Sequence, residues 1–422
     1  MIFSPEQQNE RLKWCFDGTK SGAWGDEPDG DHDVVCLRAA DFDGVSGRLN
    51  DGSRTIRAVD PATFAKVSLQ PGDLVIEKSG GGEKQLVGRA VLFNGAEPSV
   101  CSNFLARARP SARADSAYLN YLLLAIYNAR GTWPHIKQST GIQNLDMASY
   151  LNTRVSIPSL ATQSRIAQFL DRKTAQIDAL IQKKRELLDR LAEKRQALIT
   201  HAVIKGLDPN APTKDSGIDW LGEIPAHWGL VPFKWRCRVQ SGQVDPTDPH
   251  YADMTLVAPD HIESGTGRLF EATSAEEQGA ISGKYFCPKG SVLYSKIRPS
   301  LRKVALFDGE CLCSADMYAI NPGPAFDRHY LFYFLLTDAF TSYAELESMR
   351  VAMPKINREA LGSFFLPAPD LKEQRDISSH CYRLDMEIRE TVDRILHSVE
   401  QLIEYRAALI TSAVTGRMEG LR

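Results

Sequence analysis

The sequence has no long hydrophobic run, no paired cysteines and no large excess of charge. No apolar stretch approaches the ~20 residues that span a bilayer, and the start, MIFSPEQQNERLK, has no signal-peptide core. The eight cysteines are scattered without a CxxC pair, so disulfides and structural zinc are both poorly supported. These absences predict a cytoplasmic protein with no membrane segment.

The near balance of charge excludes a polycation. The chain has 50 Lys and Arg against 53 Asp and Glu, which gives a net charge of −3. Any surface that binds nucleic acid must therefore be local. The length of 422 residues is too great for one ordinary hydrophobic core, so two or more domains are expected.

Nucleotide, nucleophile and metal motifs are also lacking. The run of glycines 80–82 lies between two strand-like segments, without the Lys-Ser pair and following helix of a phosphate site. Ser300 and Lys303 have the spacing of an acyl-enzyme serine and lysine, but no companion motif is present. No HExxH or HxH spacing indicates a metal site. We expect neither a metal nor a cofactor on this chain.

Two acidic residues have a possible catalytic interpretation. Asp73 and Glu77, followed by Lys78, loosely match a nuclease acid cluster. The repeat described next places Ser291 and Ser295 at the two acidic positions. A catalytic role kept in both copies is therefore not supported, and we expect a chain that is not an enzyme.

The clearest feature that is present is a repeat built on one long helix. The stretch from about Gln163 to Val203 has no Pro or Gly and carries apolar residues at three- and four-residue steps. A second copy lies 211 residues later without a gap. Thirteen positions illustrate the match: 158, 160, 163, 166, 172, 177, 191, 195, 198, 199, 200, 202 and 203 pair with identical residues at 369, 371, 374, 377, 383, 388, 402, 406, 409, 410, 411, 413 and 414. The chain is a tandem duplication.

The repeat divides the chain into five segments. We expect an α/β domain at 1–157, a helical spacer at 158–206, a linker at 207–230, a second α/β domain at 231–366 and a second helical spacer at 367–422. In the first domain, VVCL (34–37), DLVIE (73–77), RAVLF (89–93) and TRVSIP (153–158) predict strands, and 116–128 predicts a helix. The stretch 129–145 is expected to be a polar loop. The second domain repeats the framework more loosely, with Lys78 aligned on Lys296.

The two long helices are expected to pair. Some forty residues at ~1.5 Å each make a rod of roughly 60 Å, which needs an apolar partner along its length. In one register the second copy presents an apolar seam from Ile377 to Ala413, and the first copy presents its equivalent from Ile166 to Ala202. Lys173 and Lys184 interrupt the first seam, so that helix is expected to turn partly toward another subunit there. The predicted fold is α+β, with the helices forming an antiparallel coiled coil; the alternative is a helix packed only on its own domain.

Two loop groups in each domain are candidates for DNA contact. The stretch 284–303 has six Lys and Arg and no acidic residue, which suits phosphate and guanine contacts. Glycines near Lys78 permit close backbone approach, and Gln and Asn side chains read adenine. For any one residue, a solvated surface side chain is an equally good interpretation. The candidates are Lys78, Lys84, Gln85, Arg130, Trp133, His135, Lys137, Gln138, Gln143 and Asn144 in the first domain, and Lys296, Arg298, Arg302, Lys303, Arg350, Lys355 and Asn357 in the second.

Over nearly its whole length the pattern resembles the specificity subunits of type I restriction–modification systems. The most specific segments are DSGIDWLGEIPAHW (215–228) and the helix ends RQALITHAVIKG and RAALITSAVTG. The first domain departs from the pattern, because it begins at RLKW without its own WLGEIPxHW segment.

The resemblance implies a non-catalytic subunit with two target-recognition domains, each reading one half of a bipartite site in double-stranded DNA. It implies two modification (methyltransferase) subunits and restriction (motor and nuclease) subunits as partners. S-adenosylmethionine, ATP and Mg would then be bound by those partners. The helices would set the unread spacer and dock the modification subunits.

Two other functions are compatible with parts of the sequence. A non-enzymatic coiled-coil adaptor with two protein-binding domains would suit the slightly acidic charge. A methyltransferase in its own right would need an NPPY-like tetrapeptide, which the sequence does not contain.

Overall fold

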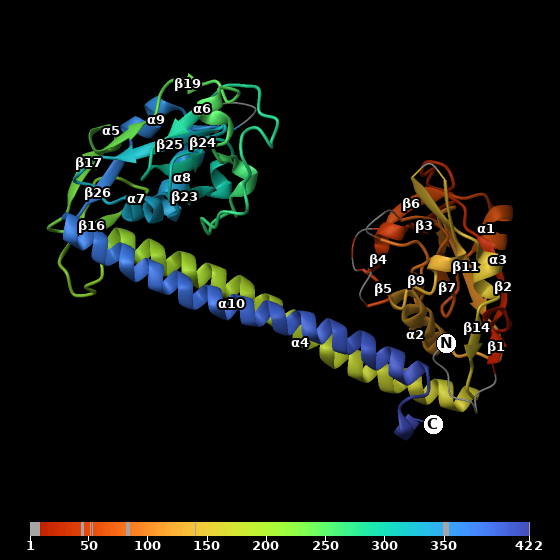
Figure 1. The fold of residues 1–422 in the computed structure, drawn as a ribbon. Coiled ribbons are helices and arrows are strands. Elements are labelled where there is room, and N and C mark those ends of the chain that lie inside the picture. The colour runs from red at the N-terminus through yellow and green to blue at the C-terminus, as the bar shows by residue number, and fades with distance from the viewer. Residues whose placement is uncertain are drawn as a thin grey trace. The chain divides into compact units, whose positions relative to one another are not determined.

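The computed structural model describes residues 9–43, 46–50, 52, 54–81, 85–139, 141–348 and 354–421. The chain forms two compact units, shown in Figure 1. Unit 1 consists of Met1–Arg185 with Leu396–Arg422, and unit 2 is Glu186–Ile395. The long helices α4 (Leu160–Lys205) and α10 (Leu371–Val414) each contribute to both units.

Unit 1 is built on a four-stranded antiparallel sheet of order β2-β11-β7-β9. Leu74 and Ile76 of β7 pack with helix α2 on one face, whereas Val75 packs with strand β3 on the other. Burial on both faces explains why this strand reads as a continuous apolar run. The elements are β1 (Asn9–Arg11), β2 (Phe16–Ser21), β3 (Asp33–Leu37), β4 (Phe42–Asp43), β5 (Arg48–Leu49), β6 (Thr55–Ala58), α1 (Pro61–Val67), β7 (Leu74–Glu77), β8 (Ser79–Gly80), β9 (Ala90–Leu92), β10 (Ser99–Cys101), β11 (Leu105–Pro110), α2 (Ser116–Asn128), β12 (Ile136–Ser139), β13 (Ile142–Leu145), α3 (Met147–Leu151) and β14 (Arg154–Ser156).

Unit 2 repeats this layering. Its main sheet has the order β18-β25-β22-β23, with Tyr294 packed toward helix α7 and Leu293 toward a second sheet, β19-β21-β24-β20. The elements are β15 (Thr213–Asp215), β16 (Glu223–Pro225), β17 (Gly229–Pro232), α5 (Phe233–Arg236), β18 (Cys237–Val239), β19 (Gln243–Val244), α6 (Pro249–Ala252), β20 (Leu256–Val257), β21 (Lys284–Cys287), β22 (Val292–Ser295), β23 (Val304–Leu306), β24 (Cys311–Cys313), β25 (Met317–Pro322), α7 (Arg328–Leu335), α8 (Asp338–Ser348), α9 (Arg358–Ser363) and β26 (Phe365–Ala368). The predicted α+β duplication is confirmed.

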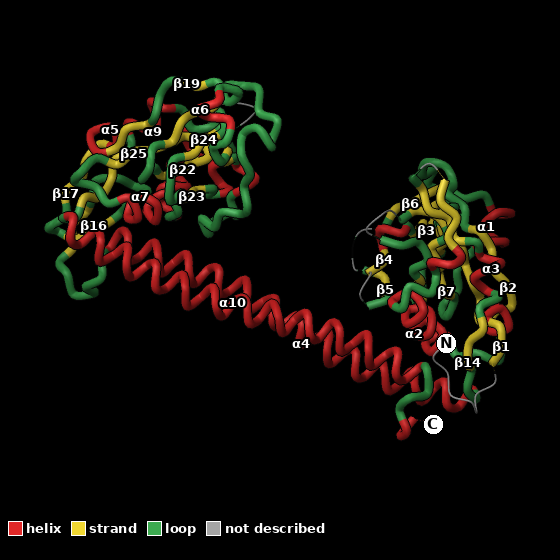
Figure 2. The backbone as a smooth tube through the Cα atoms, viewed as in Figure 1, coloured by secondary structure: helices red, strands yellow, loops and turns green. Residues whose placement is uncertain are grey.

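The helices pair in the antiparallel sense within each unit. In unit 1, Ile166 near the start of α4 shares a buried cluster with Ile410 and Val414 near the end of α10. In unit 2, Val203 near the end of α4 shares a cluster with Ile377 near the start of α10. Figure 2 shows the two helices side by side. The predicted antiparallel pair is confirmed, and the first turns of each helix pack on their own domain as well.

The predicted seam is wrong at Leu198, which is exposed while Ile199 is buried. Lys173, predicted to interrupt the seam, is exposed, and Thr174 beside it is buried. A straight helix drifts relative to a 3.5-residue repeat, so a seam drawn by fixed steps moves off the buried face by one residue.

The segment 207–230, expected as a linker, is packed into unit 2. Leu221, Ile224 and Trp228 are buried in its core. Trp228 Nε1 donates to Glu373 Oε2 in the first turn of α10 at 2.9 Å. The Trp220 ring stacks on Phe364 with centroids 4.9 Å apart. This segment therefore ties the end of α4 to the start of α10.

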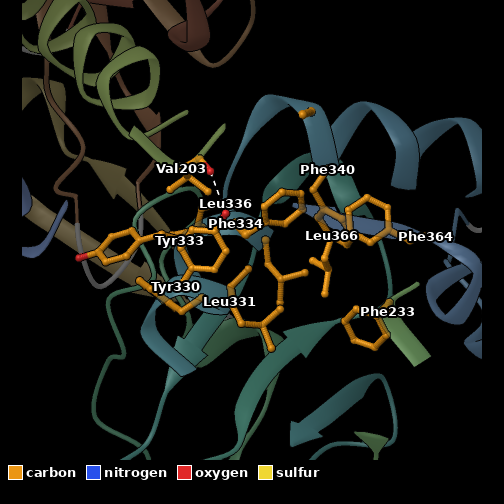
Figure 3. Packing of buried hydrophobic residues seen from close by; sticks show 14 of the residues in the cluster. Val203, Phe233, Tyr330, Leu331, Tyr333, Phe334, Leu336, Phe340, Phe364 and Leu366 are labelled. Carbon is orange, nitrogen blue, oxygen red and sulfur yellow. Dashed lines mark hydrogen bonds between the residues drawn. The ribbon is translucent and has the colours of Figure 1, made fainter. Parts of the chain in front are cut away.

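The core of unit 2 is rich in aromatic rings from α7 and its neighbours. Figure 3 shows Phe334, Phe340 and Phe364 gathered beside Tyr330, whose hydroxyl donates to the Val203 carbonyl at 2.9 Å.

All eight cysteines are buried free thiols. Among the described residues, no helix has the length and apolar character to cross a membrane.

Candidate nucleic-acid interface

In unit 1 a small sheet joins the two predicted loop groups. The stretch expected as a polar loop forms the hairpin β12–β13, and β13 pairs with β8, placing Asn144 opposite Ser79 and Gln143 opposite Gly80. The hairpin was missed because its strands, IKQS and IQNL, carry polar side chains on both faces and lack the alternation of a half-buried strand. Candidates more than fifty residues apart in the sequence thus share one sheet edge.

Some candidates of this sheet are engaged inside the domain. Gln143 is only 2% exposed, and its Oε1 accepts from the Val87 backbone N–H at 3.0 Å. Asn144 Oδ1 accepts from Ser79 Oγ at 2.7 Å. Both ring nitrogens of His135 are engaged, with Ser149 Oγ at 2.7 Å and Thr153 Oγ1 at 3.1 Å. Burial removes Gln143 from the candidate surface, whereas His135 is half-buried and has both ring nitrogens in hydrogen bonds.

Other candidates of unit 1 face solvent. The Arg130 guanidinium lies over the Trp133 ring, 5.6 Å from its centroid, and the Trp is 55% exposed. Lys137 and Gln138 on β12 are exposed. Lys137 Nζ donates to Asp146 at 2.7 Å, and this bond lowers the pKa of the Asp146 carboxyl below its ordinary value. An exposed ring with neighbouring cations suits contact with bases and phosphates.

The remaining candidates of unit 1 lie along the loop after β7. Lys78 Nζ donates to Ser21 Oγ at 2.6 Å. The exposed Gln85 amide lies against the Arg89 guanidinium. Arg89 in turn is held by Glu77 at 3.1 Å. Lys84 lies outside the described residues.

In unit 2 the second pair of loop groups also comes together. Ile356 N–H donates to the Lys296 carbonyl at 3.0 Å, and Arg298 N–H donates to the Pro354 carbonyl at 2.9 Å. Lys355 and Ile297 form an isolated antiparallel β-bridge. This edge is equivalent to that of unit 1, because Lys78 and Lys296 each follow the strand that pairs with the long strand β11 or β25. Arg350 lies outside the described residues.

Candidates in this group also divide into engaged and exposed side chains. Arg302 forms an ion pair with Asp338 at 2.6 Å, Lys303 Nζ donates to the Pro259 carbonyl, and Asn357 caps helix α9. Arg298 and Lys355 are exposed. Arg298 and Arg302 both have left-handed backbone, with φ of 47° and 48°, which turns the chain sharply around Pro299–Leu301.

The basic stretch 284–303 is not one patch. Lys284 is buried, and its Nζ donates to the Ser282 carbonyl at 2.6 Å. Lys284 begins strand β21 and is 8% exposed, which a count of charges does not reveal.

Sequence reasoning gave Arg358 no role. Its guanidinium lies over the rings of Tyr285 and Tyr318, 5.6 and 5.5 Å from their centroids, while Lys296 Nζ lies 5.5 Å from the Tyr318 ring. Burial raises the pKa of Tyr318, and the Arg358 charge opposes that rise. The tyrosines and the arginine are distant in sequence, so no local signal could have joined them.

The acidic residues near the edge are structural. Asp73 makes a bidentate pair with Arg109, with both distances 2.8 Å, and Glu77 pairs with Arg89. Within the described parts of the chain, no three His, Cys, Asp or Glu side chains gather as a metal site.

Duplicated α/β domains, each followed by a long helix and each with a cation-bearing edge, define a known class of protein. Residues 58–190 and 260–401 match the type I restriction modification DNA specificity domain, and the chain belongs to this family.

Two relatives are specificity subunits of type I restriction enzymes. The chain is 34% identical over 240 residues to the type I restriction enzyme EcoDI specificity subunit of Escherichia coli, and the match covers 53% of each. It is 22% identical over 294 residues to the MjaVIII specificity subunit of Methanocaldococcus jannaschii, covering 67% of this chain and 66% of that one. The chain thus spans about half the length of the first relative.

A solved structure shares the fold. One chain from a study of complex assembly and conformational transition in the type I R-M system superposes with a TM-score of 0.67 at 17% identity, covering 99% of this chain and all of that one.

Proposed function

We propose that this chain is the sequence-specific DNA-binding subunit of a type I restriction–modification complex. Each unit would read one half of a bipartite site in double-stranded DNA. One observation carries the proposal: equivalent edges of the two units present different exposed side chains on a shared framework. Unit 1 offers Arg130, Trp133 and Gln138, and unit 2 offers Arg298 and Lys355. Shared framework with different loops is expected of two readers of different sequences.

The partners and chemistry would come from other chains. Two modification subunits would dock on α4 and α10 and bind S-adenosylmethionine, and restriction subunits with ATP and Mg would join them. Adenine methylation inside a duplex requires base flipping, which a subunit holding the DNA on both sides would assist. This chain would be non-catalytic, and its helices would set the unread spacer.

Methylome sequencing of the host with and without the gene tests this proposal. We expect one bipartite adenine-methylation motif to disappear on deletion and to return on complementation. A complementing allele in which Arg298 and Lys355 are both alanine should fail to restore it, whereas Lys66→Ala on α1 should restore it fully. An unchanged methylome would reject the DNA-reading function and favour the adaptor.

A further inference from the structure

Two arginines at equivalent positions connect the helix pair to the domains. Arg195 on α4 and Arg406 on α10 lie 211 residues apart in the aligned repeats. Each one contacts the domain that its own helix does not directly follow: Arg195 contacts unit 2, and Arg406 contacts unit 1. Both contacts fall on a hairpin, which we call the helix-facing hairpin. Its described residues are 42–43 and 46–49 in unit 1 and 262–269 in unit 2.

In unit 2 the Arg195 guanidinium binds a helix and the hairpin together. Nε and Nη2 donate to the Asp385 carboxylate on α10 at 2.7 and 3.1 Å. Nη1 donates to the Gly265 carbonyl at 2.8 Å, and Nη2 also reaches the Thr266 carbonyl at 3.3 Å. Tyr333 on α7 donates to the same carboxylate at 3.2 Å.

In unit 1 Arg406 makes the same kind of junction. It is 2% exposed, donates to Asp178 on α4 at 2.9 Å through Nε, and reaches the Ser46 carbonyl at 3.3 Å. The hairpin is held further by Asn120, whose Nδ2 donates to the Gly47 carbonyl at 3.1 Å. The acidic partner differs in position between units, because Asp178 lies one helical turn beyond the residue equivalent to Asp385.

These junctions contribute more to the orientation of each domain on the helices than to the stability of the fold. A buried ion pair adds little net stability because desolvation offsets its attraction. A planar guanidinium that binds a carboxylate with two nitrogens fixes angles as well as distances. Two such junctions at equivalent places therefore define how each domain is oriented on its helix segment.

Each helix-facing hairpin also contacts the candidate interface. In unit 2 the Gly265 N–H donates to the Arg302 carbonyl at 3.3 Å. In unit 1 the Arg89 guanidinium lies 5.6 Å from the Phe42 ring and donates to the Ala39 carbonyl at 3.1 Å. In unit 2 the loop that carries the exposed Arg298 thus connects to the helices through Arg195. In unit 1 the connection to Arg406 runs from the Arg89 side chain.

We propose that Arg195 and Arg406 are positioning residues that determine which spacer length the protein accepts. They hold each reading edge at a fixed angle on the helix pair, without touching DNA. The proposal rests on the proposed function, and it assigns spacer selection to two side chains besides the length of the helices.

The test is methylation of a plasmid library that carries both half-sites separated by different spacers, in hosts that express each allele with the whole system. Wild type should select one spacer. In Arg406→Ala and Arg195→Ala, methylation at spacers one base pair longer or shorter should rise about tenfold, the effect of one lost charge-assisted hydrogen bond. The half-site bases should stay the same. Asp178→Asn should act like Arg406→Ala, and Lys66→Ala should act like wild type.

Thermal unfolding of each variant complex separates positioning from folding. Arg406→Lys keeps the charge but loses the two-nitrogen fork, so it should relax spacer choice with little change in Tm. Equal loss of methylation at all spacers, accompanied by a lower Tm, would overturn the proposal, as would an unchanged spacer profile. A wild-type library with no bipartite methylation would instead reject the proposed function itself.

Discussion

At the scale of single residues, the same side-chain types serve two purposes on the candidate interface. Arg302 is bound to Asp338, and Asn357 caps a helix, so their polar groups are occupied by the fold. Arg298, by contrast, is exposed on a left-handed backbone. Burial and partners, rather than residue type, therefore separate candidate readers from scaffold.

Arg298→Ala should weaken binding through the second half-site only. The expected loss is ~1–3 kcal/mol, that of one base-reading arginine. Lys289→Ala is the matched control, because this exposed lysine belongs to the same basic stretch but lies before β22 rather than after it. Competition binding against sites altered in one half measures the effect. An equal loss on all DNA sequences would reduce Arg298 to a phosphate contact, and the same comparison applies to Lys296→Ala.

Gln143 and Gln138 should separate stability from binding. Removing the buried Gln143 side chain leaves the Val87 N–H without its acceptor, which costs about 1–3 kcal/mol of unfolding free energy. Gln138, opposite Gln143 on the hairpin, is exposed, so Gln138→Ala should leave stability unchanged. Chemical denaturation of the two variants measures the difference. Equal stability would contradict the structural role of Gln143.

At the scale of elements, the last turn of each long helix accepts a hydrogen bond from a tyrosine. This tyrosine belongs to the domain of the other repeat. Tyr330 on α7 donates to the Val203 carbonyl of α4 at 2.9 Å, and Tyr118 on α2 donates to the Val414 carbonyl of α10 at 3.3 Å. These residues are equivalent in the repeat. The matching helix ends RQALITHAV and RAALITSAV therefore accept the same kind of backbone hydrogen bond, once in each unit.

Tyr330→Phe should destabilise unit 2 by about 1 kcal/mol, because a short buried hydrogen bond is lost without a cavity. Tyr118→Phe should cost less, because its hydroxyl lies farther from both its acceptors, at 3.3 and 3.5 Å. Comparing the unfolding free energies of the two variants ranks the two hydrogen bonds. The reverse order would show that distance does not control these contributions.

Much of the element list could be predicted from the sequence. Helix 116–128 was predicted with its observed ends, and the structure shows that Asp115 caps it. The long helices followed from the absence of Pro and Gly. Other features depend on distant contacts: strand β13 also pairs with β8, and Trp228 packs in the core of unit 2 and donates to Glu373. The candidate interface was predicted as clusters, but which members are exposed required the fold.

At the scale of the whole molecule, the net charge of −3 conceals local basic edges. DNA binding should therefore depend steeply on salt although the chain is slightly acidic. With about four phosphate contacts, affinity should fall about a hundredfold between roughly 50 and 200 mM salt. Fluorescence anisotropy of the assembled complex measures the slope. A flat response would contradict an electrostatic interface.

The division of the long helices has a consequence for how the protein is made. Unit 2 is one uninterrupted stretch, Glu186–Ile395, whereas unit 1 requires Leu396–Arg422 as well. The ribosome synthesises all of unit 2 before the half-helix that carries Arg406 and Val414. Until then Tyr118 and Asp178 lack these partners. The domain whose synthesis begins first is the one whose folding is completed last.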